Sequence, residues 1–180
     1  MVERHTDLKT TNSRTKHYLA GIICVLAAIF IDQWSKHLAV LHLKQGNSLV
    51  LIKGVFMLHY LENRGAAFGL FQNQKLFFVV SAIIVLGAAV WFYMRVPMNR
   101  KFLPIRVCVL FICAGAIGNM IDRLRLNYVV DFFYFELIDF PIFNVADIYV
   151  TVAVFVLAVL ILFWYKEEDF EEIFQHRDRK

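Results

Sequence analysis

Four long apolar segments constrain this chain more than any other feature. They cover about residues 18–42, 76–94, 102–122 and 147–165, and the second of them carries no charged residue. A helix needs about 20 consecutive, mostly apolar residues to cross the hydrocarbon core of a bilayer. In that medium every backbone N–H and C=O group must be bonded internally, which helices achieve. We therefore expect an all-α membrane protein with four transmembrane helices.

The composition agrees with a membrane protein. The chain is 59% hydrophobic and 19% charged, whereas soluble domains are close to one half and one quarter. Its net charge of +4 comes without a basic stripe interleaved with aromatic residues, so we expect no nucleic-acid partner. Cys24, Cys108 and Cys113 lie in apolar segments at spacings that fit neither a metal motif nor a disulfide framework, and we interpret them as packing residues.

The two ends of the chain are polar. Residues 1–17 form a basic N-terminal extension, for which we expect no regular structure, and residues 166–180 form a charged tail. Lys and Arg are concentrated in these two segments and in the short loop 95–101. Because short basic segments stay in the cytoplasm, both termini are expected there, and the first apolar segment is expected to be a retained signal anchor.

The opposite side of the membrane then receives two connecting segments. Residues 44–74 contain short apolar and aromatic pieces separated by turn signals at Gly46-Asn47 and Lys53-Gly54, which predicts a small sheet on the membrane surface. Residues 124–146 are expected to form an external loop. The domain between the two polar ends, residues 18–165, thus combines four spans, a small sheet and a loop.

Two acids on that side are candidates for chemistry. Asp131 lies in the apolar and aromatic run 128–135, and Asp147 lies at the start of the last span. Carboxylates at membrane depth are costly and are functional candidates by default. Neighbouring carboxyl groups cannot both ionise easily, which is the basis of acid–base catalysis by a pair.

Each polar residue also has a structural interpretation. Asn144 can cap the last span, and Asp147 then falls at the third helical position of a capping box. Asp32 and Lys36 are four residues apart and can pair on one helix face. An Asp122–Arg123 pair can end the third span, and Asn63 and Asn119 can bond to turns. A small transporter with proton-binding acids, or a scaffold packed through Gly115 and Gly118, remains an alternative to an enzyme.

Five segments of the chain together resemble the bacterial lipoprotein signal peptidases, or type II signal peptidases. The segments occur in the family's order: Asp32-Gln33-Trp34-Ser35-Lys36, Asn63-Arg64-Gly65-Ala66-Ala67-Phe68-Gly69, Gly115-Ala116-Ile117-Gly118-Asn119-Met120-Ile121-Asp122-Arg123, Val129-Val130-Asp131-Phe132 and Phe143-Asn144-Val145-Ala146-Asp147. Each segment alone is weak evidence, and the ordered set is specific. Ala114 stands where the family often has glycine, which is a change between two small residues.

The resemblance implies a four-span helical enzyme with a periplasmic β-cradle at about residues 44–74. It also implies an aspartic endopeptidase with Asp131 and Asp147 as its catalytic pair. The substrate would be a prolipoprotein whose cysteine already carries diacylglycerol, cleaved just before that cysteine. We expect no cofactor and no metal. Membrane phospholipid is expected as a further partner, and the enzyme is expected to be a monomer. The resemblance also implies that it is located in the inner membrane, with the active site on the periplasmic side. The positions that match the family's supporting residues are Asn63, Gly65, Asn119, Asp122, Arg123, Asn144, Ala146, Asp32 and Lys36.

Overall fold

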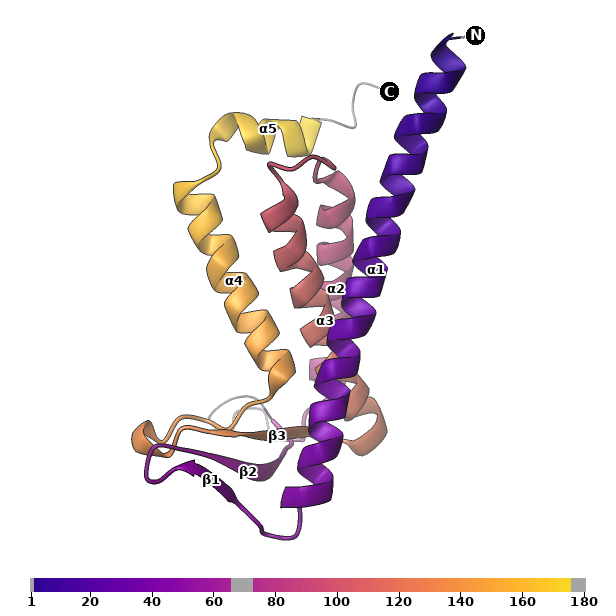
Figure 1. Ribbon diagram of the computed structural model, residues 1–180. Helices are drawn as coiled ribbons and strands as arrows, with labels where there is room; N and C mark the ends of the chain where they lie inside the picture. The colour runs from indigo at the N-terminus through magenta and orange to yellow at the C-terminus, as the bar shows by residue number, and fades with distance from the viewer. Residues whose placement is uncertain (1, 66–72, 176–180) are drawn as a thin grey trace.

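The computed structural model describes residues 2–65 and 73–175. Helices α1 (Val2–Leu43), α2 (Lys75–Arg95), α3 (Leu103–Leu126) and α4 (Val145–Phe163) run roughly along one axis, and a small sheet lies across one end of the bundle (Figure 1). Each of the four helices contains a segment long and apolar enough to cross a membrane. The expected fold class, a helical membrane protein with four spans and a small sheet, is confirmed.

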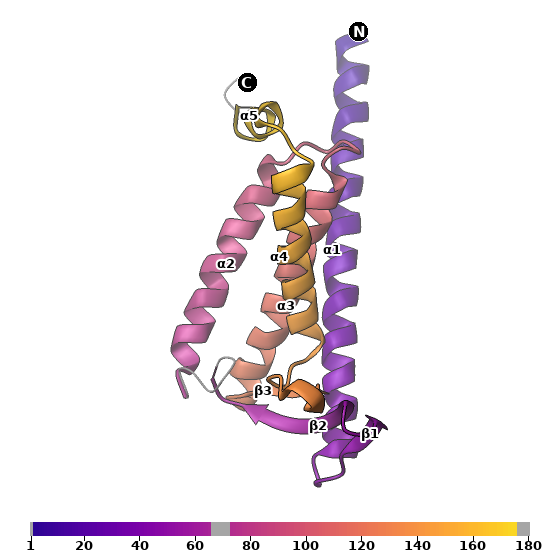
Figure 2. The same ribbon diagram turned by 90° about the vertical axis from the view of Figure 1, so that its left-hand side faces the viewer.

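Helix α3 is the centre of the bundle. In the side view, α3 lies between α2 and α1, with α4 in front of it, and α3 contacts all three of these helices (Figure 2). Small residues let α3 approach its neighbours closely. A Cβ atom added at Gly115 would lie 2.5 Å from the carbonyl oxygen of Ala146 in α4, and one added at Gly118 would lie 2.5 Å from Asp32 Oδ2 in α1. Both glycines are therefore needed where the three helices meet.

The sheet has three antiparallel strands in the order β1 (Leu49–Ile52), β2 (Phe56–Asn63) and β3 (Val129–Tyr134). The first two come from the segment 44–74, as expected. The third comes from the segment 124–146, which was expected to be a loop. Its run of β-branched and aromatic residues favours a strand, and it pairs with β2 so that Asp131 stands opposite Leu61. Between β3 and α4 lies a short 3-10 helix, η2 (Glu136–Ile138).

The N-terminal extension continues the first span as one helix. Our expectation of no regular structure was wrong for residues 2–17, because α1 extends without a break from Val2 to Leu43. Neither glycine nor proline interrupts these residues. Once the apolar span has formed a helix, additional residues only propagate it, and propagation avoids the cost of a new nucleus.

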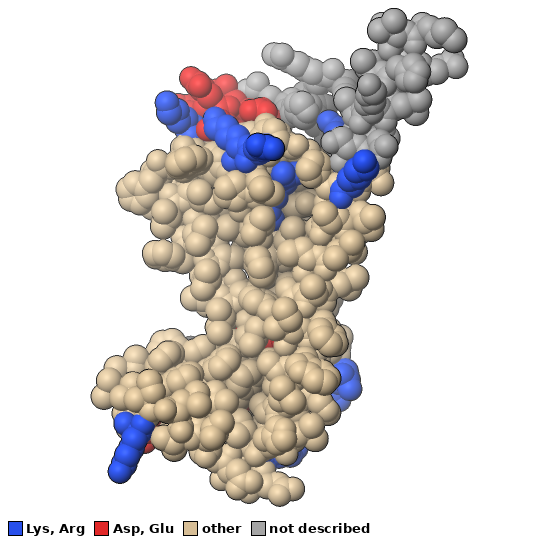
Figure 3. Space-filling model, in the orientation of Figure 1, with Lys and Arg blue, Asp and Glu red and all other residues tan. Residues whose placement is uncertain are grey.

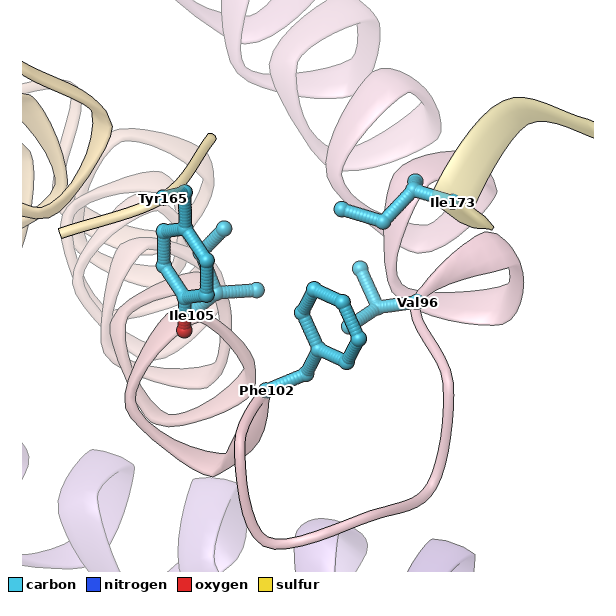
Figure 4. Packing of buried hydrophobic residues seen from close by; sticks show 5 residues of the cluster. All are labelled: Val96, Phe102, Ile105, Tyr165 and Ile173. Atoms are coloured by element: carbon cyan, nitrogen blue, oxygen red, sulfur yellow. The ribbon is translucent and has the colours of Figure 1, made fainter. Parts of the chain in front are cut away.

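The charged tail forms a docked helix, α5 (Glu167–Gln175), that crosses the ends of the spans opposite the sheet (Figure 1). Its Ile173 packs with Val96, Phe102, Ile105 and Tyr165, and the ring of Phe102 points into the middle of this group (Figure 4). Lys101, in the connection between α2 and α3, forms a salt bridge with Asp169 of α5. The tail therefore closes one end of the bundle.

Charged side chains gather at the two ends of the molecule. On the face shown in Figure 3, Lys, Arg, Asp and Glu lie near the end closed by α5 and near the sheet, with almost none between among the described residues. The apolar band between the two ends coincides with the spans. The first turns of α1 and the whole of α5 lie at the same end of the molecule, opposite the sheet (Figure 1).

Candidate active site

Asp147 is held by the N-terminus of α4. Asn144 is the N-cap: its Oδ1 accepts the backbone N–H of Asp147 at 3.0 Å, and Asp147 Oδ2 accepts the backbone N–H of Asn144 at 3.1 Å. This reciprocal pair is a capping box. The capping interpretation of Asn144 and Asp147 is confirmed, and it fixes the Asp147 carboxylate at the end of the span nearest the sheet.

Asp131 is held by strand β3, at the edge of the three-stranded sheet. Its side chain is only 1% exposed, between Val130 and Phe132, which are buried as well. Its Oδ2 accepts a hydrogen bond from Asn63 Nδ2 at 2.8 Å, and its Oδ1 accepts one from Asn144 Nδ2 at 2.6 Å. Strand pairing places Asn63 and Asp131 close together, although 68 residues separate them in the chain.

Three asparagine side chains aim their amide N–H groups at the two carboxylates. Asn63 and Asn144 donate to Asp131, and Asn119 Nδ2 donates to Asp147 Oδ1 at 2.8 Å. Each amide has its orientation set by a neighbour that can only donate. The Oδ1 of Asn63 accepts the N–H of Gly65, that of Asn144 accepts the N–H of Asp147, and that of Asn119 accepts from the Lys36 ammonium. Turning any of the three would place donor against donor.

A buried ionic group lies directly behind the two carboxylates. The ammonium of Lys36 lies 2.9 Å from Asp32 Oδ2 and 3.1 Å from Asp122 Oδ2, and all three side chains are almost fully buried. The predicted Asp32–Lys36 pair is confirmed, whereas Asp122 pairs with Lys36 and not with Arg123. Unpaired buried charge is strongly destabilising, so the loss of any one of these three residues would leave a costly charge behind.

Arg123 and Gly65 connect α3 to the end of β2. Arg123 Nη2 donates to the carbonyl of Gly65 at 3.4 Å, and its guanidinium lies 4.4 Å from the centre of the Phe78 ring in α2. Ala146 is fully buried and donates its N–H to Asp32 Oδ1 at 2.9 Å. Every supporting residue that we expected therefore lies in one continuous network around Asp131 and Asp147. Ala66, Ala67, Phe68 and Gly69 of the second segment lie outside the described residues.

The surroundings of Asp131 favour its neutral form. Burial, followed by the negative charge of nearby Asp147, raises the pKa of Asp131 from 3.8 to about 7, although the amides of Asn63 and Asn144 act in the opposite direction. A carboxyl group with such a pKa can hold a proton near neutral pH while its neighbour is ionised. This is the arrangement that general acid–base catalysis by a pair requires.

One residue of this network, Gln33, lies in the first of the five segments but was not among the supporting residues that we expected. The side-chain nitrogen of Gln33 lies 3.1 Å from Asp32 Oδ2, 3.0 Å from Asp122 Oδ1 and 3.2 Å from the carbonyl oxygen of Gly118. A polar residue beside Asp32 in an apolar helix was a visible signal. Its partners on α3, however, lie 85 and 89 residues away, and no local pattern relates them.

The family is shown by comparison with known proteins. The family model for Signal peptidase (SPase) II matches residues 24–163. The chain is 48% identical over 147 residues to a lipoprotein signal peptidase of Streptococcus thermophilus (strain CNRZ 1066), covering 82% of this chain and 93% of that protein. It is 42% identical over 149 residues to one of Streptococcus pyogenes serotype M1, with 83% and 95% covered.

Two solved structures are similar over most of their length. A bacterial membrane enzyme solved by the in meso method at 2.3 Å resolution has a TM-score of 0.71 at 31% identity, covering 79% of this chain and 87% of that one. A second, solved at 1.9 Å, has a TM-score of 0.69 at 30% identity, with 81% and 94% covered. Together with the match over residues 24–163, these similarities establish that the chain belongs to the signal peptidase II family of aspartic peptidases.

Proposed function

We propose that Asp131 and Asp147 are the catalytic pair with which this chain acts as a lipoprotein signal peptidase, removing signal peptides from prolipoproteins. The observation that carries the proposal is the convergence of three oriented amides on two carboxylates, one of which has a pKa raised to about 7. Structural carboxylates are normally ionised and paired with cations. Asp131 instead is surrounded by neutral donors and apolar side chains.

The pair would hydrolyse the peptide bond through a shared proton. Ionised Asp147 takes a proton from a water molecule, whose oxygen attacks the scissile carbonyl carbon. Neutral Asp131 gives its proton to the carbonyl oxygen, and a tetrahedral diol forms. The C–N bond then breaks as the proton now on Asp147 passes to the leaving amine, and a diol hydroxyl returns its proton to Asp131. Each carboxyl group therefore ends in its starting state.

The position of the site fits a substrate that stays in the membrane. Asp147 lies in the first turn of a span and Asp131 lies in the adjoining sheet, so the scissile bond would be reached at the end of the apolar band. We propose that the substrate is a prolipoprotein whose cysteine carries diacylglycerol, that cleavage falls just before this cysteine, and that the acyl chains remain among membrane phospholipids. We propose that the protein acts as a monomer, because residues of one chain complete the network around both aspartates.

Orientation in the membrane follows from charge. Arg95 and Lys101 contact α5, and Lys166 immediately precedes this helix. Basic segments are retained in the cytoplasm. We propose that both termini are cytoplasmic and that the sheet and the two aspartates lie on the opposite, extracytoplasmic face of the cell's inner membrane.

The substrate is tested with a diacylglyceryl-modified prolipoprotein and its unmodified twin, incubated with the purified full-length chain in detergent. Cleavage is followed by the gel shift, and the new N-terminus is read by mass spectrometry. We expect release of the signal peptide only from the modified protein, with the lipidated cysteine as the first residue of the product. Equal cleavage of both proteins would contradict the lipid requirement, and cleavage elsewhere would contradict the proposed bond.

A further inference from the structure

Two buried carboxylates hold the peptide segments that lead into the proposed catalytic pair. Asp32 Oδ1 accepts the N–H of Ala146, the residue before Asp147, at 2.9 Å. Asp122 Oδ2 accepts the N–H of Val130, the residue before Asp131, at 3.1 Å. The positions of the two catalytic aspartates thus depend on where the carboxylates of Asp32 and Asp122 lie relative to each other.

Two side chains of α1 connect those carboxylates. The Lys36 ammonium lies 2.9 Å from an oxygen of Asp32 and 3.1 Å from one of Asp122. The Gln33 amide nitrogen lies 3.1 Å from the same Asp32 oxygen and 3.0 Å from the other oxygen of Asp122. Lys36 also bonds to Asn119, which contacts Asp147. The Gln33 nitrogen instead directs its hydrogen bonds to Asp32, Asp122 and the Gly118 carbonyl.

The charges explain why a second bridge is needed. Asp32 and Asp122 carry two negative charges, and Lys36 supplies one positive charge. Two carboxylates in a medium of low polarity repel each other unless donors lie between them. All three neighbours of the Gln33 nitrogen are acceptors, so its N–H groups must face them. Without these donors, the repulsion between Asp32 and Asp122 is opposed chiefly by Lys36.

We propose that Gln33 is a positioning residue for the peptidase reaction: by bridging Asp32 and Asp122, it sets the spacing between the backbone segments that carry Asp131 and Asp147. This inference rests on the proposed function of those two aspartates. In this role Gln33 acts through Asp32 and Asp122 and touches neither the scissile bond nor the catalytic carboxyl groups. Its loss should therefore slow the chemical step and leave substrate binding nearly unchanged.

The test compares Gln33→Met, which keeps the size of the side chain and removes its donors, with Gln33→Glu. Gln45→Met, in the exposed turn after α1, is the matched control. Initial cleavage rates of the lipidated prolipoprotein are measured with each full-length protein between about pH 5 and pH 8. A misplacement of about 1 Å can lower a rate by about 100-fold, so Gln33→Met should lower kcat by about 10- to 100-fold with KM within about twofold, while Gln45→Met matches the wild type.

Gln33→Glu separates positioning from a simple packing role. The ionisable and charged groups that face position 33 are Asp32 and Lys36 on α1 and Asp122 on α3, with Asp131 on β3 and Asp147 on α4 beyond them. The introduced carboxyl group can still donate one hydrogen bond when it is protonated, whereas it adds a third negative charge when it is ionised. The kcat of Gln33→Glu relative to the wild type should therefore fall as pH rises, and recover at low pH.

The outcomes are distinct. If the wild type cleaves the substrate, two results overturn the positioning role and leave the proposed function intact. One is an unchanged kcat for Gln33→Met, and the other is a pH profile of Gln33→Glu that is parallel to that of the wild type. A changed KM with unchanged kcat does the same. If Gln33→Met does not fold, as judged by thermal unfolding in detergent, the recovery of Gln33→Glu at low pH decides the question. Failure of the wild type itself to cleave overturns the proposed function and this inference with it.

Discussion

At the scale of single residues, Asn144 contributes to the site in two separable ways. Its Oδ1 caps α4, and its Nδ2 donates to Asp131 and to Asn119 Oδ1. Serine is also a good N-cap but has no amide to reach Asp131. Asn144→Ala should cost about 1 kcal/mol of stability through the lost cap and also lower the cleavage rate.

Asn144→Ser should recover most of that stability and little of the activity. Thermal unfolding in detergent and initial cleavage rates, measured on the same preparations, check both parts. Full activity in the serine variant would show that the amide donor to Asp131 is dispensable and that Asn144 acts only as a cap.

The raised pKa of Asp131 predicts two effects of pH. In the unfolded chain this carboxyl group titrates near 3.8, and in the folded protein its pKa is about 7. The contribution to stability is therefore fully present below about pH 4 and is lost as pH rises through about 7, because ionisation is then opposed only in the folded state. Catalysis that needs a proton on Asp131 should decline over the same upper range.

Between about pH 5 and pH 8, we measure the cleavage rate of the wild type and the unfolding temperatures of the wild type and of Asp131→Asn. The unfolding temperature of the wild type should fall more steeply with rising pH than that of Asp131→Asn, which cannot ionise at this position. Parallel curves for the two proteins would mean that Asp131 is already ionised at the lower end of this range.

At the scale of elements, the contact between α3 and α4 sets where Asp147 lies. A Cβ at Gly115 would meet the Ala146 carbonyl oxygen at 2.5 Å and Val150 Cγ2 at 2.6 Å, so Gly115→Ala must push α4 away. Gly87→Ala in α2 is the matched control, because a Cβ there would meet no described atom within 4 Å apart from its chain neighbours and the adjacent backbone of its own helix. We expect Gly115→Ala to lower the cleavage rate by about 100-fold through a shift of about 1 Å, and Gly87→Ala to leave it unchanged.

Rates and unfolding temperatures of the two alanine variants test this contact. If Gly115→Ala were as active as the wild type, α4 could move without consequence for the reaction, and the close approach of the two helices would have no catalytic role. A loss of activity in Gly87→Ala would instead point to a role for the exposed face of α2 in the reaction.

The sequence predicted the membrane-spanning helices but not strand β3, and the difference has a physical reason. The spans were predicted from length and hydropathy alone, and each expected span overlaps a helix that is long and apolar enough to cross a membrane. Strand β3 was missed because its partner, β2, lies two spans earlier in the chain, and pairing between distant segments leaves no local periodicity. Gln33 was missed for a similar reason, since α1 and α3 must first pack before its amide meets Asp122.

At the scale of the whole molecule, the sequence did predict that the polar residues meet. Four spans with basic ends on one side bring α1, β2, α3, β3 and α4 together at the other, where Asp32, Asn63, Asp122, Asp131 and Asp147 are joined in one network. Family membership excludes the transporter and scaffold alternatives. The orientations of the three amides depended on packing and could not be read from the sequence.

The proposed orientation in the membrane is tested with single cysteines at two exposed positions. Lys53→Cys lies in the hairpin between β1 and β2, and Glu168→Cys lies on α5. A membrane-impermeant maleimide should label Lys53→Cys in intact cells and Glu168→Cys only after permeabilisation, with the native cysteines of the spans as background. Labelling of both in intact cells, or the reverse order, would contradict the orientation.

The catalytic pair is tested most directly by the rate at which Asp131→Asn and Asp147→Asn cleave the lipidated prolipoprotein. Asp139→Asn is the matched control, since Asp139 is exposed and its carboxylate bonds to Tyr134, away from both catalytic aspartates. We predict that both single variants insert and fold but do not cleave, while the control cleaves like the wild type. A folded Asp131→Asn or Asp147→Asn protein with normal turnover would contradict the catalytic pair.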